Sequence, residues 1–316
     1  MFKNKYPLKI FAIICFSVIL LTSIIVGVFG INTGIEFSGG SQIEIKLSYS
    51  ENETVVSGRE NAAEYVNGVK DVLKEHGCNI DSYFVEDKLI DTYLVVRIAK
   101  TKIDGSETIA QEIADKLNID ASAVSTVQTL KSYFTGKQVL YIGISVAVLL
   151  LLCFFVGWLR YGLNAGVSLA FAGLHNLIIS LALMLLWRVQ LSVISLVGLV
   201  VFTVITIFAL VFILERVREN SGSSQYENLN SAEQLLLATK QSKHLAWIAV
   251  VVFALVVVML CVPINYVKLA AVSILICLLV CMYTSVGVAP ALHSYMLEMF
   301  KQKQKEKLSK NVVNKK

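Results

Sequence analysis

The chain has 316 residues, of which 56% are hydrophobic and only 16% are charged, and its mean hydropathy is +0.68. Soluble domains carry about 25% charged residues, so this composition excludes an ordinary water-soluble protein. The formal net charge of +5 combines two unlike parts. Residues 31–137 hold 11 Lys/Arg and 17 Asp/Glu, a net −6, whereas the remainder holds 17 and 6, a net +11.

Six apolar stretches are long enough to cross about 30 Å of hydrocarbon, which requires about 20 helical residues. None of them contains Asp or Glu. The first has a long apolar core and no small-residue cleavage site after Gly30, so we interpret it as an uncleaved anchor rather than a secretory signal. The sequence thus predicts an α-helical polytopic membrane protein with six transmembrane helices, at residues 8–30, 138–157, 163–187, 191–214, 245–264 and 268–294.

Basic residues indicate the orientation, because cytoplasmic loops are enriched in Lys and Arg. The two short loops on one side hold only Arg188 and Lys268. The other side holds fifteen basic residues: Lys3, Lys5, Lys9, Arg160, Arg216, Arg218, Lys240, Lys243 and seven lysines between 301 and 316. We therefore predict a protein of the cytoplasmic membrane with both termini cytoplasmic and residues 31–137 external.

The C-terminal residues 298–316 are expected to be a basic cytoplasmic tail lying near anionic membrane lipids. Nucleic acid is not expected as a partner, since no aromatic residue follows Phe300 to stack on bases.

The segment 31–137 is the only long soluble stretch and is predicted to form one small α+β domain. Residues 42–47 alternate strictly between polar and apolar, as in a half-buried strand. The order β-α-β-β-α-β is that of a ferredoxin-like fold, a fold that names no function by itself. The other predicted elements are a helix over 62–73, strands over 83–85 and 93–98, a helix starting at Ser106 and a strand over 122–130.

The third predicted span, within the five-helix bundle of residues 138–297, carries His175 and Asn176 near its middle, about 18 Å from its start. Polar groups at that depth are rare and usually face a bundle interior or a water-filled path. The two residues either line an ion or proton path or form hydrogen bonds between helices. We favour hydrogen bonds, because Asn176 cannot titrate and His175 has no second titratable group in its span.

Small and hydroxyl residues form one face on each of three predicted spans, which predicts a compact core between them. Pro290 in the last span is expected to mark a kink or a helix end. The faces comprise Ala165, Ser168, Ala172, Asn176 and Ser180 in the third span, Ser192, Ser195, Gly198 and Thr206, with Thr203 beside them, in the fourth, and Ala270, Ser273, Cys277, Cys281 and Thr284 in the sixth.

The sequence offers no motif of an enzyme. No CxxC, HExxH or phosphate-binding loop is present. Cys277 and Cys281 share a helical face, but a thiol pair in a membrane span is more often packing than metal ligation. We expect no catalytic residue, metal or cofactor.

A glycine-rich segment after the first span resembles the signature of the SecD and SecF translocon subunits. It reads Gly34, Ile35, Glu36, Phe37, Ser38, Gly39, Gly40, and its last two glycines would let the chain turn into the first external strand. Two further segments are similar to this family. They are the exit of the fourth span, Glu215, Arg216, Val217, Arg218, Glu219, Asn220, and, in the sixth, Tyr283, Thr284, Ser285 with Ala289, Pro290.

The resemblance implies a SecF-like subunit that assists export of polypeptides. Its implied partners are a SecD-like subunit, the SecYEG channel and the exported polypeptide, with proton flow driving external-domain motion and SecA acting from inside. It makes six residues candidate polar or relay positions: His175, Asn176, Thr203, Thr206, Thr284 and Ser285.

Two departures from the family pattern bear on proton coupling. Asn176 stands where the family usually has Asp, and the fourth-span pattern G-Y-S-x-N-D falls on residues 204–209, which read V-I-T-I-F-A. Either a partner SecD supplies the carboxylate or the chain acts mainly as a scaffold. The alternative functions are a half-transporter of the resistance-nodulation-division type, moving a small molecule or lipid, and a membrane-anchored sensor, against which the lack of a cytoplasmic output domain argues.

Overall fold

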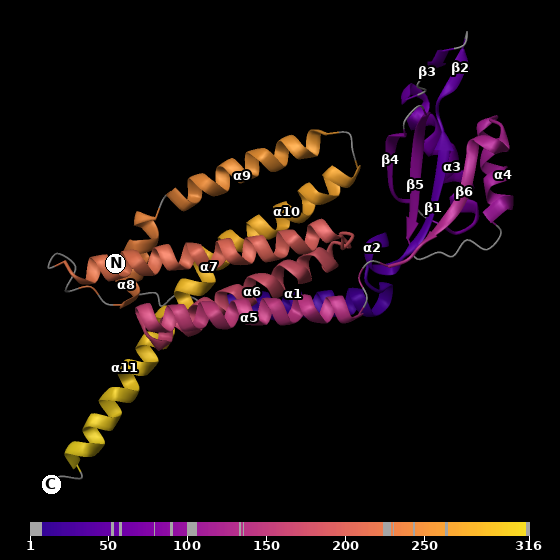
Figure 1. Cartoon of the computed structure of the whole chain (residues 1–316). Coiled ribbons are helices and arrows are strands. Elements are labelled where there is room, and N and C mark those ends of the chain that lie inside the picture. Colours follow the sequence, from indigo (N-terminus) through magenta and orange to yellow (C-terminus); the bar gives the residue numbers. More distant parts are fainter. Residues whose placement is uncertain are drawn as a thin grey trace.

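The computed structural model describes residues 8–313 except for 52–53, 57–58, 79, 89–90, 100–105, 133, 135, 224–228, 230, 243 and 263–264. Five of the fifteen basic residues that indicated the orientation lie outside the described residues: Lys3, Lys5, Lys243, Lys315 and Lys316. Long helices form one part of the molecule, and a small α/β part stands at one end of them (Figure 1). Helix α11 (Ala289–Val313) extends from the opposite end.

Five segments among the described residues are long and apolar enough to cross a membrane. They belong to α1 (Leu8–Phe29), α5 (Gly136–Tyr161), α6 (Leu163–Leu186), α7 (Val193–Ser221) and the run of α10 (Asn265–Tyr283), a π-helical turn (Thr284–Val288) and the first part of α11. These are the first four predicted spans and the sixth. The chain is therefore a multi-pass membrane protein.

The fifth predicted span is shorter than expected. Helix α9 (His244–Cys261) has 18 residues, a length of about 27 Å, and its uninterrupted apolar part is Trp247–Cys261. It packs mainly on α10 and diverges from α7 (Figure 1). The described residues thus contain five candidate spans and one shorter apolar helix.

Helices α6, α7 and α10 form the centre of the bundle, whereas α1 and α5 expose most of their apolar side chains, as lipid-facing helices do. The predicted faces of small residues meet there. Ser195 and Ser273 join α7 to α10 through their hydroxyl oxygens, 3.0 Å apart. At the contact of α5 and α6, a Cβ on Gly166 would lie 2.6 Å from the Phe154 carbonyl oxygen. The predicted compact core between α6, α7 and α10 is confirmed, because the residues of the three predicted faces are buried.

The α/β part contains a four-stranded antiparallel sheet of order β4-β5-β1-β6. Its strands are β1 (Gly40–Lys46), β4 (Ile80–Lys88), β5 (Asp91–Ala99) and β6 (Val124–Leu130). Helices α3 (Ala62–Glu75) and α4 (Ser106–Leu117) share one core with β1 and β5. The alternation in β1 is as predicted, with Ile43 and Ile45 fully buried.

Several elements were not predicted from the sequence. They are the short α2 (Ile35–Ser38), the hairpin of β2 (Tyr49–Glu51) and β3 (Thr54–Val56), and α8 (Ser231–Gln241) in the loop after α7. Helix α7 continues to Ser221, seven residues beyond the predicted end of the fourth span. The basic tail is helical to Val313, and Pro290 does not end the helix. Proline is tolerated there because it lies in the first turn of α11, directly after the π-helical turn.

Candidate functional site

The glycine-rich signature forms the junction between the first span and the α/β part. The backbone N–H of Gly34 donates to the Leu191 carbonyl at 2.8 Å, and the N–H of Leu191 donates to the Asn32 carbonyl at 2.9 Å. The Asn32 amide also donates to the Arg188 carbonyl at 3.0 Å. The signature is therefore tied to the loop between α6 and α7, which sequence reasoning did not anticipate.

Gly39 turns the chain from α2 into β1. Its backbone angles are φ 67° and ψ −175°, a region that only glycine populates readily. An L-amino acid with a side chain would strain the backbone here. The glycine is thus required by the path of the chain between membrane and sheet.

The segment that leaves the sheet after β6 packs against the glycine-rich signature. The Phe134 ring stacks on the Phe37 ring with a centroid distance of 4.8 Å and an interplanar angle of 17°. The Ser132 hydroxyl donates to the Phe37 carbonyl at 2.7 Å, and the Phe134 N–H donates to the Glu36 carbonyl at 3.0 Å. Both connections to the membrane part therefore pack as one unit, which we call the junction (residues 32–40, 132, 134 and 188–191).

His175 and Asn176 point to different neighbours. The His175 ring contacts Cys15 Sγ of α1 through Nε2 at 2.9 Å and the Thr284 hydroxyl through Nδ1 at 3.0 Å. The Asn176 amide donates to the Thr203 hydroxyl of α7 at 3.2 Å and is fully buried. These adjacent residues therefore join different helices and do not converge on one shared group.

Three of the candidate relay hydroxyls donate to carbonyls of their own helices. Thr203, Thr206 and Ser285 donate to the carbonyls four residues earlier, at 2.7, 2.8 and 2.7 Å. Such bonds satisfy a hydroxyl inside a membrane without a partner from another helix. Three buried oxygens of α6 have no hydrogen-bond partner among the described residues: Asn164 Oδ1, Asn176 Oδ1 and Ser180 Oγ.

The π-helical turn Thr284–Val288 begins at the residue that contacts His175. Single π turns inside α-helices are rare and occur frequently at functional sites. The pattern Tyr283, Thr284, Ser285 indicated this position in the sequence, but the residue types there did not predict a π-helical turn.

The exit motif of the fourth span contacts two other elements. Glu215 accepts bonds from Arg160 Nη2 at 3.1 Å and from the Tyr161 hydroxyl, at the turn between α5 and α6. Asn220 is buried and donates to Gln241 of α8 at 2.8 Å. Arg216 and Glu219 pair within α7 at 2.6 Å, and Arg218 is exposed. The motif therefore connects α7 to the α5–α6 turn and to α8, at the end of the bundle that is remote from the sheet.

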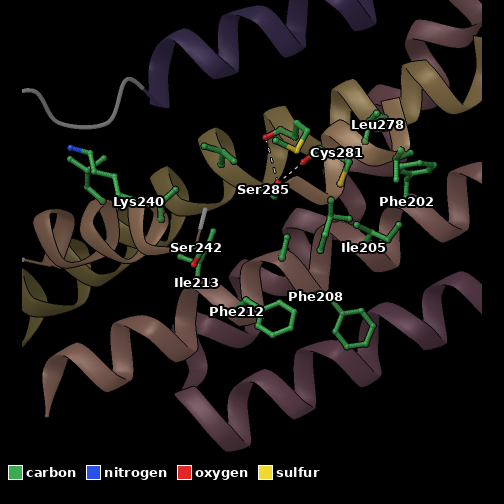
Figure 2. A pocket seen from close by; sticks show the side chains of 18 residues that line it. Phe202, Ile205, Phe208, Phe212, Ile213, Lys240, Ser242, Leu278, Cys281 and Ser285 are labelled. Atoms are coloured by element: carbon green, nitrogen blue, oxygen red, sulfur yellow. Dashed lines mark hydrogen bonds between the residues drawn. The ribbon is translucent and has the colours of Figure 1, made fainter. Parts of the chain in front are cut away.

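An apolar groove of about 830 Å³ lies between α7 and α9, and residues of α10 also line it (Figure 2). No pattern in the sequence indicated this groove, because it results from the divergence of α9. Ser285, one of the predicted relay positions, lines it. Within the described part of the chain, no group of three His, Cys, Asp or Glu is placed to hold a metal ion.

This architecture defines a class of protein: a multi-pass membrane protein whose α/β part joins the bundle directly after the first span. The family "Protein export membrane protein SecD/SecF, C-terminal" matches residues 107–299, and the "SecD/SecF GG Motif" matches residues 24–48. The chain belongs to the SecD/SecF family of protein export membrane proteins.

A solved structure supports the same fold. The structure "Crystal structure of SecDF in Super-membrane-facing form" superposes with a TM-score of 0.72 at 17% sequence identity. The match covers 96% of this chain and 40% of that chain, so this chain spans less than half the length of that protein. No curated protein matches the sequence.

Proposed function

We propose that this chain is a SecF-type accessory subunit of the Sec translocase that assists export of polypeptides across the cytoplasmic membrane. The observation that carries this proposal is the SecD/SecF family match over residues 107–299, preceded by the GG motif at the junction. A SecD-like subunit and the SecYEG channel are its proposed partners. No catalytic site of its own is needed for this role.

The proposed topology has six spans, with α9 crossing as the fifth, both termini cytoplasmic and residues 31–137 outside. A helix of about 27 Å can cross when the bilayer thins slightly around it. The strand order β4-β5-β1-β6 supports a ferredoxin-like external domain, because both helical crossovers then skip one strand. The small number of basic residues in the short loops on that side, Arg188 and Lys268 against fifteen on the other side, supports the external placement.

The junction would transmit movement between the two parts. It connects the external domain to the end of α1 and to the loop before α7 through backbone hydrogen bonds. A shift of α6 or α7 would therefore displace the start of β1. This arrangement suits a domain that holds an emerging polypeptide and moves with the membrane helices.

For the intramembrane polar residues we propose a structural role. His175 and Asn176 each have a hydrogen-bond partner on another helix, and the predicted spans contain no carboxylate. A proton relay built on this chain would need its carboxylate from the SecD-like partner.

Pulse-chase measurement of exported precursors tests the proposed function. Deleting the gene should slow precursor maturation, and re-expression of the wild-type chain should restore it. A chain with Gly39→Ala should restore it less well than one with Gly136→Ala, a glycine where an added Cβ meets nothing within 4 Å. Unchanged maturation after deletion, in cells whose membrane remains energised, would refute the proposal.

A further inference from the structure

The groove between α7 and α9 has an apolar body and a basic end. Ile205, Phe208 and Phe212 of α7 line one side, and Ile248, Ala249 and Val252 of α9 line the other. Figure 2 shows Lys240 and Ser242 at one end and Phe202 and Leu278 toward the other. The hydroxyls of Thr239, Ser242 and Ser285 also line the groove. Each donates to the carbonyl four residues earlier, so these hydroxyls add little polarity.

A second, polar cavity of about 570 Å³ adjoins this groove and shares Lys240 with it. Its other lining residues are Arg216, Asn220 and Gln241. The Asn220–Gln241 hydrogen bond fixes the end of α7 against α8, and so holds the two basic side chains near one another. Arg216 pairs with Glu219 of its own helix, in an exposed ion pair that can exchange partners with another anion.

We infer that the groove and the adjoining polar cavity together form a binding site for an anionic glycerophospholipid. Its acyl chains would lie in the groove, and its phosphate would lie between Arg216 and Lys240. Clusters of basic residues between membrane helices bind anionic headgroups in this manner. The position of the basic end, beside the amphipathic loop helix α8 and remote from the sheet (Figure 1), is the level at which headgroups would lie.

The groove is too small to enclose a transmembrane helix of a partner. A spanning helix about 10–12 Å wide and 30 Å long has a volume of about 3,000 Å³. The groove offers about 830 Å³, which is within the range of roughly 300–1,000 Å³ typical of small-ligand sites. Its apolar lining continues to the lipid-facing surface through Phe208 and Phe212, which are 59% and 50% exposed. A lipid can therefore enter from the bilayer without opening the bundle.

Native mass spectrometry of the full chain tests the site. The chain is purified in mild detergent and incubated with equal amounts of dioleoyl-phosphatidylglycerol and dioleoyl-phosphatidylcholine. We expect one phosphatidylglycerol molecule to be retained in preference to phosphatidylcholine. Lys240→Gln should weaken that preference about fivefold, whereas Lys268→Gln, at the opposite end of the bundle, should leave it unchanged.

A second pair of variants tests the groove itself. Ala249→Phe fills the groove and should abolish retention, whereas Ala254→Phe, on the exposed side of the same helix, should not. Equal retention in both variants, or retention without headgroup preference, would overturn the inference.

A photo-crosslinking residue in place of Met282, which lines the groove and is half-buried, identifies the occupant in native membranes. A phospholipid adduct supports the inference, and a polypeptide adduct refutes it in favour of a partner helix. These measurements require only the folded chain, in detergent or in a membrane, so their outcome does not depend on a role in export.

Discussion

Gly39→Ala should loosen the base of the external sheet, because Gly39 has backbone angles of φ 67° and ψ −175°. Non-glycine residues held in that region cost about 1–3 kcal/mol each. The chain cannot relieve this strain easily, since α2 and β1 on either side are fixed by the junction. The opening free energy of β1 should therefore fall by that amount, which corresponds to roughly 5–150-fold faster amide exchange.

Hydrogen exchange of the full chain in lipid nanodiscs measures this effect. Peptides covering residues 40–47 should exchange faster in the variant, while peptides from α6 and α7 should keep their protection. Gly136→Ala is the matched control, since its added Cβ meets nothing within 4 Å and it has no positive φ. Unchanged protection of β1 in Gly39→Ala, or an equal loss in Gly136→Ala, would show that the backbone argument is wrong.

Three further predictions follow from individual contacts. Gly166→Ala should destabilise the bundle by about 1–3 kcal/mol, because its Cβ would meet the α5 backbone. Gly143→Ala should be neutral or stabilising, because its Cβ would meet nothing within 4 Å. Thermal unfolding in detergent compares the two variants. Asn176→Ala should cost no more than about 1.7 kcal/mol and leave precursor export unchanged, so abolished export at a normal protein level would make Asn176 functional. The Lys46 ammonium holds the pKa of Asp91 below its usual value. The contribution of the ionised Asp91 to stability is therefore present at neutral pH and is lost as the pH falls through that lowered pKa. Asp91→Asn should remove this acid dependence of amide exchange in β5. An unaltered pH profile in the variant would contradict the prediction.

The exposed apolar surface fits a chain that works in an assembly. Large side chains on α1, α5 and α7 are exposed, among them Phe16, Leu159 and Phe208 at 68%, 84% and 59%. In a bilayer, lipid or partner helices would cover them. The lipid site inferred beside α7 occupies one part of this surface and leaves the rest for subunit contacts.

The sequence by itself determined most of the elements and the family. Long apolar runs specify membrane helices because an unsatisfied backbone in hydrocarbon is too costly, and four predicted spans agree closely with α1, α5, α6 and α7. Period-two and helical patterns predicted the strands and helices of the α/β part, including the strand at residues 42–47. The glycine-rich signature at Gly34–Gly40 indicated the family that the comparisons then showed.

Only the tertiary structure decided how these elements meet. His175 and Asn176 are adjacent in the chain, yet a helix turns about 100° per residue, so their partners are on different helices. The bonds from Gly34 and Asn32 to the α6–α7 loop join residues more than 150 positions apart. The groove exists because α9 diverges from α7, and no single segment encodes such an angle. Local pattern specifies what each segment becomes, whereas contacts between distant segments, which depend on the whole packed bundle, determine the junction and the groove.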